Sequence, residues 1–205
     1  KTGVAPKTAP KIAELLKAAG LNETQGTADI TYAPNHADIS TSTCVVYQDG
    51  EKRSITGAIA DMKIEGTVGE AAKITFTVQG FTSPEPTLEA NPTVTLDTNT
   101  LMIVSKITAI TLAGSVLNIT KFEFTLNNET KLDYATAMSE FARKDFAPKI
   151  KLSGIKTKGD LTAWTDLTAA TVKEIIIVLG SGAGKTVTIT ATQTMTSDME
   201  ENDND

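Results

Sequence analysis

The segment from Cys44 to Gly80 alternates apolar and polar residues and is interrupted by glycines. Its clearest part places Ile74, Phe76 and Val78 on one side of the chain, with lysine, threonine and glutamine between and beside them. A period of two residues is typical of a strand with one buried and one exposed face. The pattern predicts a mainly β, antiparallel fold in which the glycines separate short strands and turns.

The composition agrees with a β-rich chain that has a core. Of 205 residues, 34 are threonine, a β-branched residue that favours strands, and 40% are hydrophobic. Aromatic residues make up only 5% of the chain. That low content argues against a stacking platform for sugars or single-stranded nucleic acid. No segment reaches the length of about 18 apolar residues needed to span a membrane.

The acidic charge is concentrated at one end. The net charge is −6, and residues 197–205 contain five acids, so the rest of the chain carries −6 + 5 = −1. We expect an irregular arm at residues 1–7, a single β domain at 8–196 and an acidic, disordered tail at 197–205. No cluster of basic residues stands out, so tight binding to a phosphate backbone is not expected.

A helix is predicted over residues 8–19. Thr8 can cap it, Pro10 suits its first turn, and Gly20 can end it in the left-handed conformation. Its apolar stripe consists of Ile12, Leu15, Leu16 and Ala19. The polar segment 22–42 that follows is predicted to be a long loop.

Strands are predicted over most of the remaining chain, with a hairpin turn at Asp49-Gly50 and further turns at 113–115 and 127–128. The proline-containing segment 81–92 is predicted to be a loop or a strand edge. Residues 135–143 fit a short helix or an irregular loop, and periodicity does not decide between them. The expected strands are 44–47, 52–55, 60–65, 73–79, 94–97, 101–112, 116–126, 149–152, 173–179 and 187–195.

No residue set typical of catalysis or metal binding stands out. Cys44 and His36 are the single cysteine and the single histidine, which leaves no intramolecular disulfide and makes a zinc site with nitrogen and sulfur ligands improbable. A Ser-His-Asp set would have to use His36 in a polar loop. Trp164 is expected to anchor a core or an interface. We therefore predict no enzymatic activity, no cofactor and no metal site.

One segment imitates a nucleotide-binding P-loop. The apolar run 174–179 precedes Gly180, Gly184, Lys185 and Thr186, but only three residues separate the two glycines where the motif needs four. The motif also needs a helix whose N-terminus faces the phosphates. Residues 187–192 carry threonine at every second position, which indicates a strand. We therefore reject Gly180, Gly184, Lys185 and Thr186 as a cofactor-binding site and predict a hairpin with a glycine-rich tip.

Several short pieces, taken in order, resemble a known family. They begin with IAELLKAAGL at residues 12–21 and end with ITFTVQG at 74–80. Between them lie Glu23-Thr24, 32–34, 47–50, 54–58 and 64–69. In their order and spacing these pieces resemble the tail tube (major tail) proteins of long-tailed, siphovirus-type bacteriophages. The resemblance covers residues 12–80, and the C-terminal half shows only a compatible strand pattern.

The resemblance implies a two-sheet β-sandwich or barrel with one flanking N-terminal α-helix. It further implies hexameric rings that stack into a tube, with DNA passing through the lumen without specific binding. The implied partners are copies of the same chain and other tail proteins, such as the tape measure and the tail terminator, with no membrane involved. The implied location is the virion tail, preceded by the host cytoplasm during assembly. A monomeric β-sandwich binding or adhesion module remains the alternative.

Overall fold

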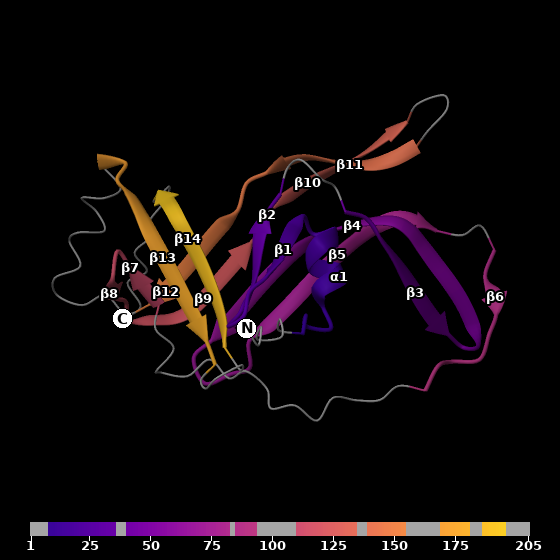
Figure 1. Cartoon of the computed structure of the whole chain (residues 1–205), viewed down its shortest axis with the longest axis horizontal. Coiled ribbons are helices and arrows are strands. Elements are labelled where there is room, and N and C mark those ends of the chain that lie inside the picture. Colours follow the sequence, from indigo (N-terminus) through magenta and orange to yellow (C-terminus); the bar gives the residue numbers. More distant parts are fainter. Residues whose placement is uncertain are drawn as a thin grey trace, which may run out of the picture. The chain divides into compact units, whose positions relative to one another are not determined.

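The computed structural model describes residues 8–35, 40–82, 85–93, 110–134, 139–154, 169–180 and 186–195. The fold is mainly β with antiparallel sheets, as the sequence predicts (Figure 1). Two compact units are present and are described separately. The first unit comprises residues 1–64, 74–99 and 124–150, and the second comprises 65–73, 100–123 and 151–205.

The helix of the first unit is shorter than predicted. Helix α1 spans Ala13–Ala18, and its N-cap, Ile12, makes no side-chain capping bond, so Thr8 does not cap it. The physical reason is Pro10, because a proline disfavours helical geometry in the residue before it. The chain enters through a turn in which the Ala13 amide donates to the carbonyl of Pro10 at 2.9 Å. The predicted end is confirmed, since Gly20 has φ 90° and follows the last turn.

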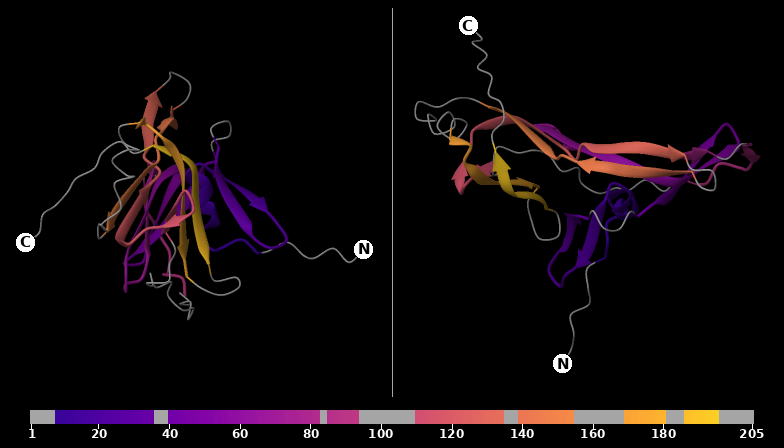
Figure 2. Two further views of the ribbon diagram at one scale, coloured as in Figure 1. Left: turned by 90° about the vertical axis from the view of Figure 1, so that its left-hand side faces the viewer. Right: turned by 90° about the horizontal axis from the view of Figure 1, so that it is seen from above.

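The loop predicted over residues 22–42 is wrong, because much of it is a hairpin. Strand β1, Leu21–Gln25, pairs antiparallel with β2, Ile30–Pro34. The hairpin lies beside α1 in both views of Figure 2. Leu21 is buried, and the other strand residues are half-buried or exposed. These strands were not predicted because most of their side chains are polar and face solvent, so their sequence lacks the alternation of apolar and polar residues that indicates a strand.

The hairpin predicted around Asp49-Gly50 is confirmed. Strand β3, Ser42–Gln48, pairs with β4, Glu51–Thr67, and the register places Gln48 opposite Glu51. The two turn residues have φ 52° and 80°, the left-handed values that a two-residue hairpin turn requires. Gly57 does not end a strand as expected, because it lies inside β4 with φ 59°.

The segment with the clearest alternation forms β5, Lys73–Thr82, which pairs with β4. Its alternation is confirmed, although Phe76 and Val78 are only half-buried and Ile74 is exposed. The proline-containing segment contributes β6, Thr87–Leu88, which pairs with the first residues of β4 and so forms a strand edge.

Residues 139–143, the described part of the segment 135–143, are neither the helix nor the irregular loop considered for them. They belong to strand β11, Ser139–Phe146, which pairs with β10, Asn128–Tyr134. The core of the first unit lies where β4 passes α1 and the start of β10. Its buried apolar residues are Ala13, Leu16, Ala18, Ala19, Leu21, Ala58, Ile59, Ala60, Met62, Ile64 and Leu126.

The second unit contains a four-stranded sheet with the order β14-β13-β7-β8. The strands are β7, Ile110–Leu112; β8, Ser115–Val116; β13, Val172–Leu179; and β14, Val187–Met195. The predicted turn at 113–115 is confirmed, with Leu112 paired to Ser115 across it. Ile110, Ile177 and Leu179 are buried on this sheet.

A six-stranded sheet has the order β12-β9-β4-β3, with β5 and β6 also paired to β4. Strand β9 spans Ile119–Thr125 and β12 spans Lys149–Gly154. The strand predicted at 116–126 is thus split into β8 and β9. Only glycine fits at position 154 without a shift of the backbone, because a Cβ atom there would lie 2.2 Å from the carbonyl oxygen of Asn118.

Several predictions lie outside the described residues. These are the arm at 1–7, the strands at 94–97 and 101–109, the tail at 197–205, His36 and Trp164.

The close approach at Gly154 generates a stability prediction. Gly154→Ala should lower the free energy of unfolding by about 2–3 kcal/mol, because the added methyl group overlaps a carbonyl oxygen of the backbone. Gly114→Ala is the matched control. Gly114 has φ 81° and open space around it, so this substitution should cost only about 1 kcal/mol of left-handed strain. Urea unfolding measures both values, and equal losses would contradict the packing argument.

Candidate functional site

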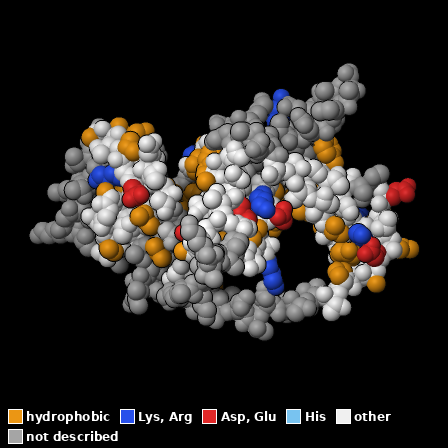
Figure 3. All heavy atoms as spheres, in the orientation of Figure 1, with side chains coloured by type: hydrophobic (Ala, Val, Ile, Leu, Met, Phe, Trp, Pro, Cys, Tyr) orange, Lys and Arg blue, Asp and Glu red, His pale blue; other side chains and the backbone are white. Residues whose placement is uncertain are grey.

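The strand at one end of the six-stranded sheet is poorly covered. Strand β3 pairs with β4, and its neighbouring residues Val45 and Val46 are 42% and 48% exposed. Successive strand residues point to opposite faces, so the hairpin leaves apolar side chains uncovered on both faces. Hydrophobic side chains are visible over this end of the molecule in Figure 3. Strand β3 contains no charged residue.

A polar clasp holds β6 at the tip of the same hairpin. The Lys52 Nζ contacts the Glu89 carboxylate at 2.8 Å, and the Tyr47 hydroxyl donates to the same carboxylate at 3.3 Å. The Glu89 amide donates to the carbonyl oxygen of Gly50 at 3.0 Å. The Lys52 ammonium lowers the pKa of Glu89, and Glu89 in turn raises the pKa of Lys52. The clasp presents Leu88 to solvent, where it is 90% exposed.

The four-stranded sheet has a second end strand without charge. Strand β14 has the sequence VTITATQTM and pairs with β13. Thr188, Thr190 and Thr192 are exposed along it. At the far end of the ladder, Val172 and Met195 pair with each other and are both exposed. Strand β14 therefore carries apolar and uncharged polar side chains and no charge along its whole length.

Two other strands of these sheets carry exposed lysines. Strand β12, at the opposite end of the six-stranded order, exposes Lys149 and Lys151, and β5 begins with the exposed Lys73. Charged side chains, lysine above all, are a common means of preventing a sheet edge from pairing with another chain. Strands β3 and β14 lack this protection, as does the two-residue end strand β8, whose Val116 is exposed. Of the three, β3 and β14 are seven and nine residues long, and their length makes them the candidate sites for pairing with another strand.

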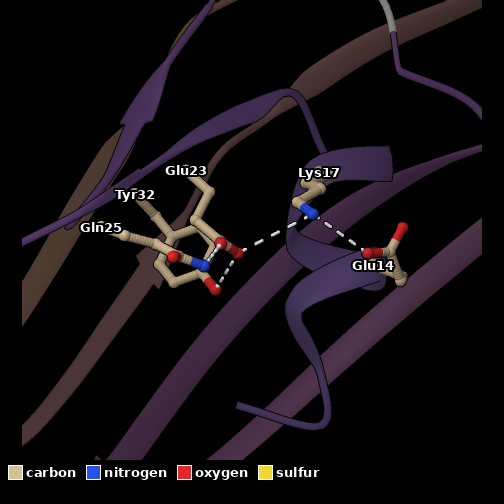
Figure 4. Close-up of polar contacts among 5 residues, drawn as sticks. All are labelled: Glu14, Lys17, Glu23, Gln25 and Tyr32. Carbon is tan, nitrogen blue, oxygen red and sulfur yellow. Dashed lines mark hydrogen bonds and ion pairs between the residues drawn. The ribbon is translucent and has the colours of Figure 1, made fainter. Parts of the chain in front are cut away.

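A separate polar cluster joins α1 to the β1–β2 hairpin (Figure 4). The Glu23 carboxylate accepts hydrogen bonds from the Tyr32 hydroxyl at 2.7 Å and from the Gln25 side chain at 2.8 Å. Lys17 lies 3.8 Å from Glu23 and 3.0 Å from Glu14. The bond from Tyr32 lowers the pKa of Glu23, and burial raises the pKa of Tyr32. Because these side chains bind one another, we interpret the cluster as a contact that holds α1 against the hairpin.

Of the residues singled out in the sequence, the structure describes Cys44, Gly180 and Thr186. Cys44 lies half-buried on β3, with its sulfur 4.0 Å from the Ser42 hydroxyl, and His36 lies outside the described residues. Gly180 follows β13 with φ 81°, and Thr186 precedes β14. Gly184 and Lys185 lie outside the described residues. The strand predicted after this loop is confirmed as β14, while the rejection of nucleotide binding stays a prediction.

The clasp at the hairpin tip has no signal in the sequence. Its ion pair joins Lys52 and Glu89 across 37 positions, and the strand that brings them together is only two residues long. Within the described ranges, no group of three or more histidine, cysteine, aspartate or glutamate residues is placed to hold a metal ion. Over the same ranges, no helix is both long and apolar enough to cross a membrane.

Comparison with protein-family models, with curated proteins and with solved structures found no match to this chain.

The Glu23 cluster generates a pH prediction. Because the folded pKa of Glu23 is lowered, its contribution to stability is present above the unfolded pKa of about 4.3 and is lost as the pH falls through the folded value. Glu23→Gln should therefore destabilise the protein at pH 7, and the difference from wild type should shrink toward pH 3. Urea unfolding at several pH values measures this difference. The control is Glu70→Gln, at an exposed turn carboxylate. If the loss of unfolding free energy in Glu23→Gln is the same at every pH, the Glu23 carboxylate does not stabilise the fold through this cluster.

Proposed function

We propose that this chain is a structural subunit that assembles with copies of itself by pairing the open sheet edges β3 and β14. The observation that carries the proposal is the contrast between these two edges and the lysine-bearing strands β5 and β12. An exposed, uncharged edge pairs readily with a further strand. Neighbouring copies would supply that strand and cover the apolar side chains that the single chain leaves exposed.

The two different edges favour a ring over a simple dimer. Pairing of one edge with itself gives a two-fold dimer, in which the other edge remains open. Pairing of β3 from one copy with β14 from the next is heterologous, and such contacts close into rings when the rotation between subunits permits. Rings with a continuous wall of strands are what the resemblance at residues 12–80 implies.

The proposed assembly is the tail tube of a long-tailed bacteriophage, built from stacked hexameric rings. The six-stranded and four-stranded sheets supply the strands that a two-sheet sandwich would require. Outside the acidic segment 197–205 the chain is nearly neutral, which suits a wall along which DNA slides without being held. In this role the protein has no enzymatic activity, and its partners are its own copies and other tail proteins. It would act in the virion tail after assembly in the host cytoplasm.

Charged substitutions on the two edges test the pairing. Val46→Lys on β3 and Thr190→Lys on β14 should each raise the concentration needed for assembly by about tenfold or more, equivalent to about 1.4 kcal/mol per contact. Ser153→Lys is the matched control on β12, where Lys149 and Lys151 are already exposed. Light scattering would report assembly, and negative-stain microscopy would show whether rings or tubes form.

Two results would contradict this proposal. A wild-type protein that remains monomeric at every concentration and salt tested would favour the binding or adhesion module. Assembly that is insensitive to both edge lysines but is lost in Ser153→Lys would assign the contact to a different edge.

The single cysteine provides a second test of which edges meet. Cys44 lies on β3, and cysteines introduced one at a time at Thr188, Ile189, Thr190, Ala191 and Thr192 would lie on both faces of β14. If β3 and β14 of successive copies pair, at least one variant should form a covalent ladder under mild oxidation, because a disulfide needs Cα atoms about 4.4–6.8 Å apart. Ser153→Cys is the control. Tubes that form without a ladder in any of the five β14 variants would contradict this pairing.

A further inference from the structure

Strand β3, the proposed pairing edge of the first unit, is stabilised by little apolar burial. All of its residues are half-buried or exposed. Its ladder with β4 is irregular between Ser42 and Cys44, so the regular pairing runs only from Cys44 to Gln48. An edge that is already formed binds more tightly than one that has to be ordered on contact, because ordering costs free energy. Contacts other than burial are therefore needed to keep β3 in place against β4.

One carboxylate joins the two strands of this hairpin. Glu89 accepts hydrogen bonds from the Tyr47 hydroxyl on β3 at 3.3 Å and from the Lys52 ammonium on β4 at 2.8 Å. Tyr47 and Lys52 are paired in the ladder. The Lys52 Nζ also lies 5.9 Å from the centre of the Tyr47 ring, within the range of a cation–π contact. The Glu89 carboxylate therefore links a residue of β3 to its partner on β4.

The backbone of the same residue contacts the turn between these strands. The Glu89 amide donates to the carbonyl oxygen of Gly50 at 3.0 Å, directly after β6 pairs with the first two residues of β4. Residues 85–93 are all exposed, so β6 itself is kept in place by polar contacts and not by burial. Glu89 thus contacts β3, β4 and the turn at once, although it is 37 positions from Lys52.

We propose that Glu89 is a positioning residue that keeps β3 in place as a pairing edge. The inference rests on the proposed assembly and adds to it a residue that lies on neither edge. Without the Glu89 carboxylate, Tyr47 and Lys52 lose their shared partner, and the tip of the hairpin opens more often. The apparent affinity of the edge then falls with the fraction of molecules that present it.

Amide hydrogen exchange of the full chain, at concentrations below those of assembly, tests this role without any assembly. Lys52→Glu places a second carboxylate beside Glu89 and removes the ion pair. The Glu89 amide and the protected amides of residues 44–52 should then exchange about fivefold faster or more, because opening a segment without buried residues costs little. The amides of residues 58–64 should keep their wild-type rates, which a general loss of stability would not allow.

A charge exchange separates the clasp from the general effect of a new charge. The double variant Lys52→Glu/Glu89→Lys restores an opposite pair, so its hairpin amides should return to within about twofold of the wild-type rates. Leu88→Ser is the matched control within β6. Leu88 is 90% exposed, and its side chain lies on the opposite face of the strand from Glu89, so the rates should not change.

Assembly of the same variants, followed by light scattering, tests the consequence for the edge. Lys52→Glu should need at least about twice the wild-type concentration, because a smaller fraction of its molecules presents β3, and the double variant should recover. Wild-type exchange rates in Lys52→Glu would overturn the inference, as would a double variant as labile as the single one. Faster exchange with unchanged assembly would also overturn it. A wild-type chain that never assembles would refute the proposed assembly itself, and a role in pairing with it, whereas the exchange rates would still show whether Glu89 stabilises the hairpin.

Discussion

The buried amide of Asn128 is the contact on which the first unit most depends. Its side-chain amide donates hydrogen bonds to the carbonyl oxygen of Ala19 at the end of α1 and to that of Ala60 in the middle of β4. The backbone N–H of the same residue donates to the carboxylate of Asp61. Ala19 and Ala60 are completely buried, and their small side chains let the backbones approach the amide. The carbonyl of Ala19 lies at the end of a helix, where it has no partner within the helix. A single polar residue therefore connects segments from three distant parts of the sequence.

Local patterns predicted the local structure well. The turn at Asp49-Gly50, the end of the helix at Gly20 and the strand after the glycine-rich loop all depend on neighbouring residues, and all are confirmed. In each case the required backbone conformation is one that the residue type itself favours.

Contacts between distant residues could not be predicted. The polar strands β1 and β2 form because they pair with each other beside α1, and nothing in their own composition indicates a strand. The role of Asn128 depends on carbonyl groups far away in the sequence, and the Lys52–Glu89 clasp depends on a two-residue strand. Propensity does not report such pairings, because the partner of each group is fixed only when the tertiary structure forms. The sequence shows that the segments of β3 and β14 carry no charge, but it does not show that these strands lie at the ends of their sheets.

Gly57 divides β4 into two parts that differ in their resistance to local opening. Residues after it, from Ala58 to Ile64, include the most deeply buried positions of the unit, whereas residues from Glu51 to Thr56 are half-buried or exposed. The free energy of opening a segment follows the contacts that it must break. The hairpin tip is therefore expected to open more often than the second part of the same strand, and its amide hydrogens to exchange faster. A strand that is continuous in hydrogen bonding thus belongs to two cooperative units, and the more labile of them carries β3.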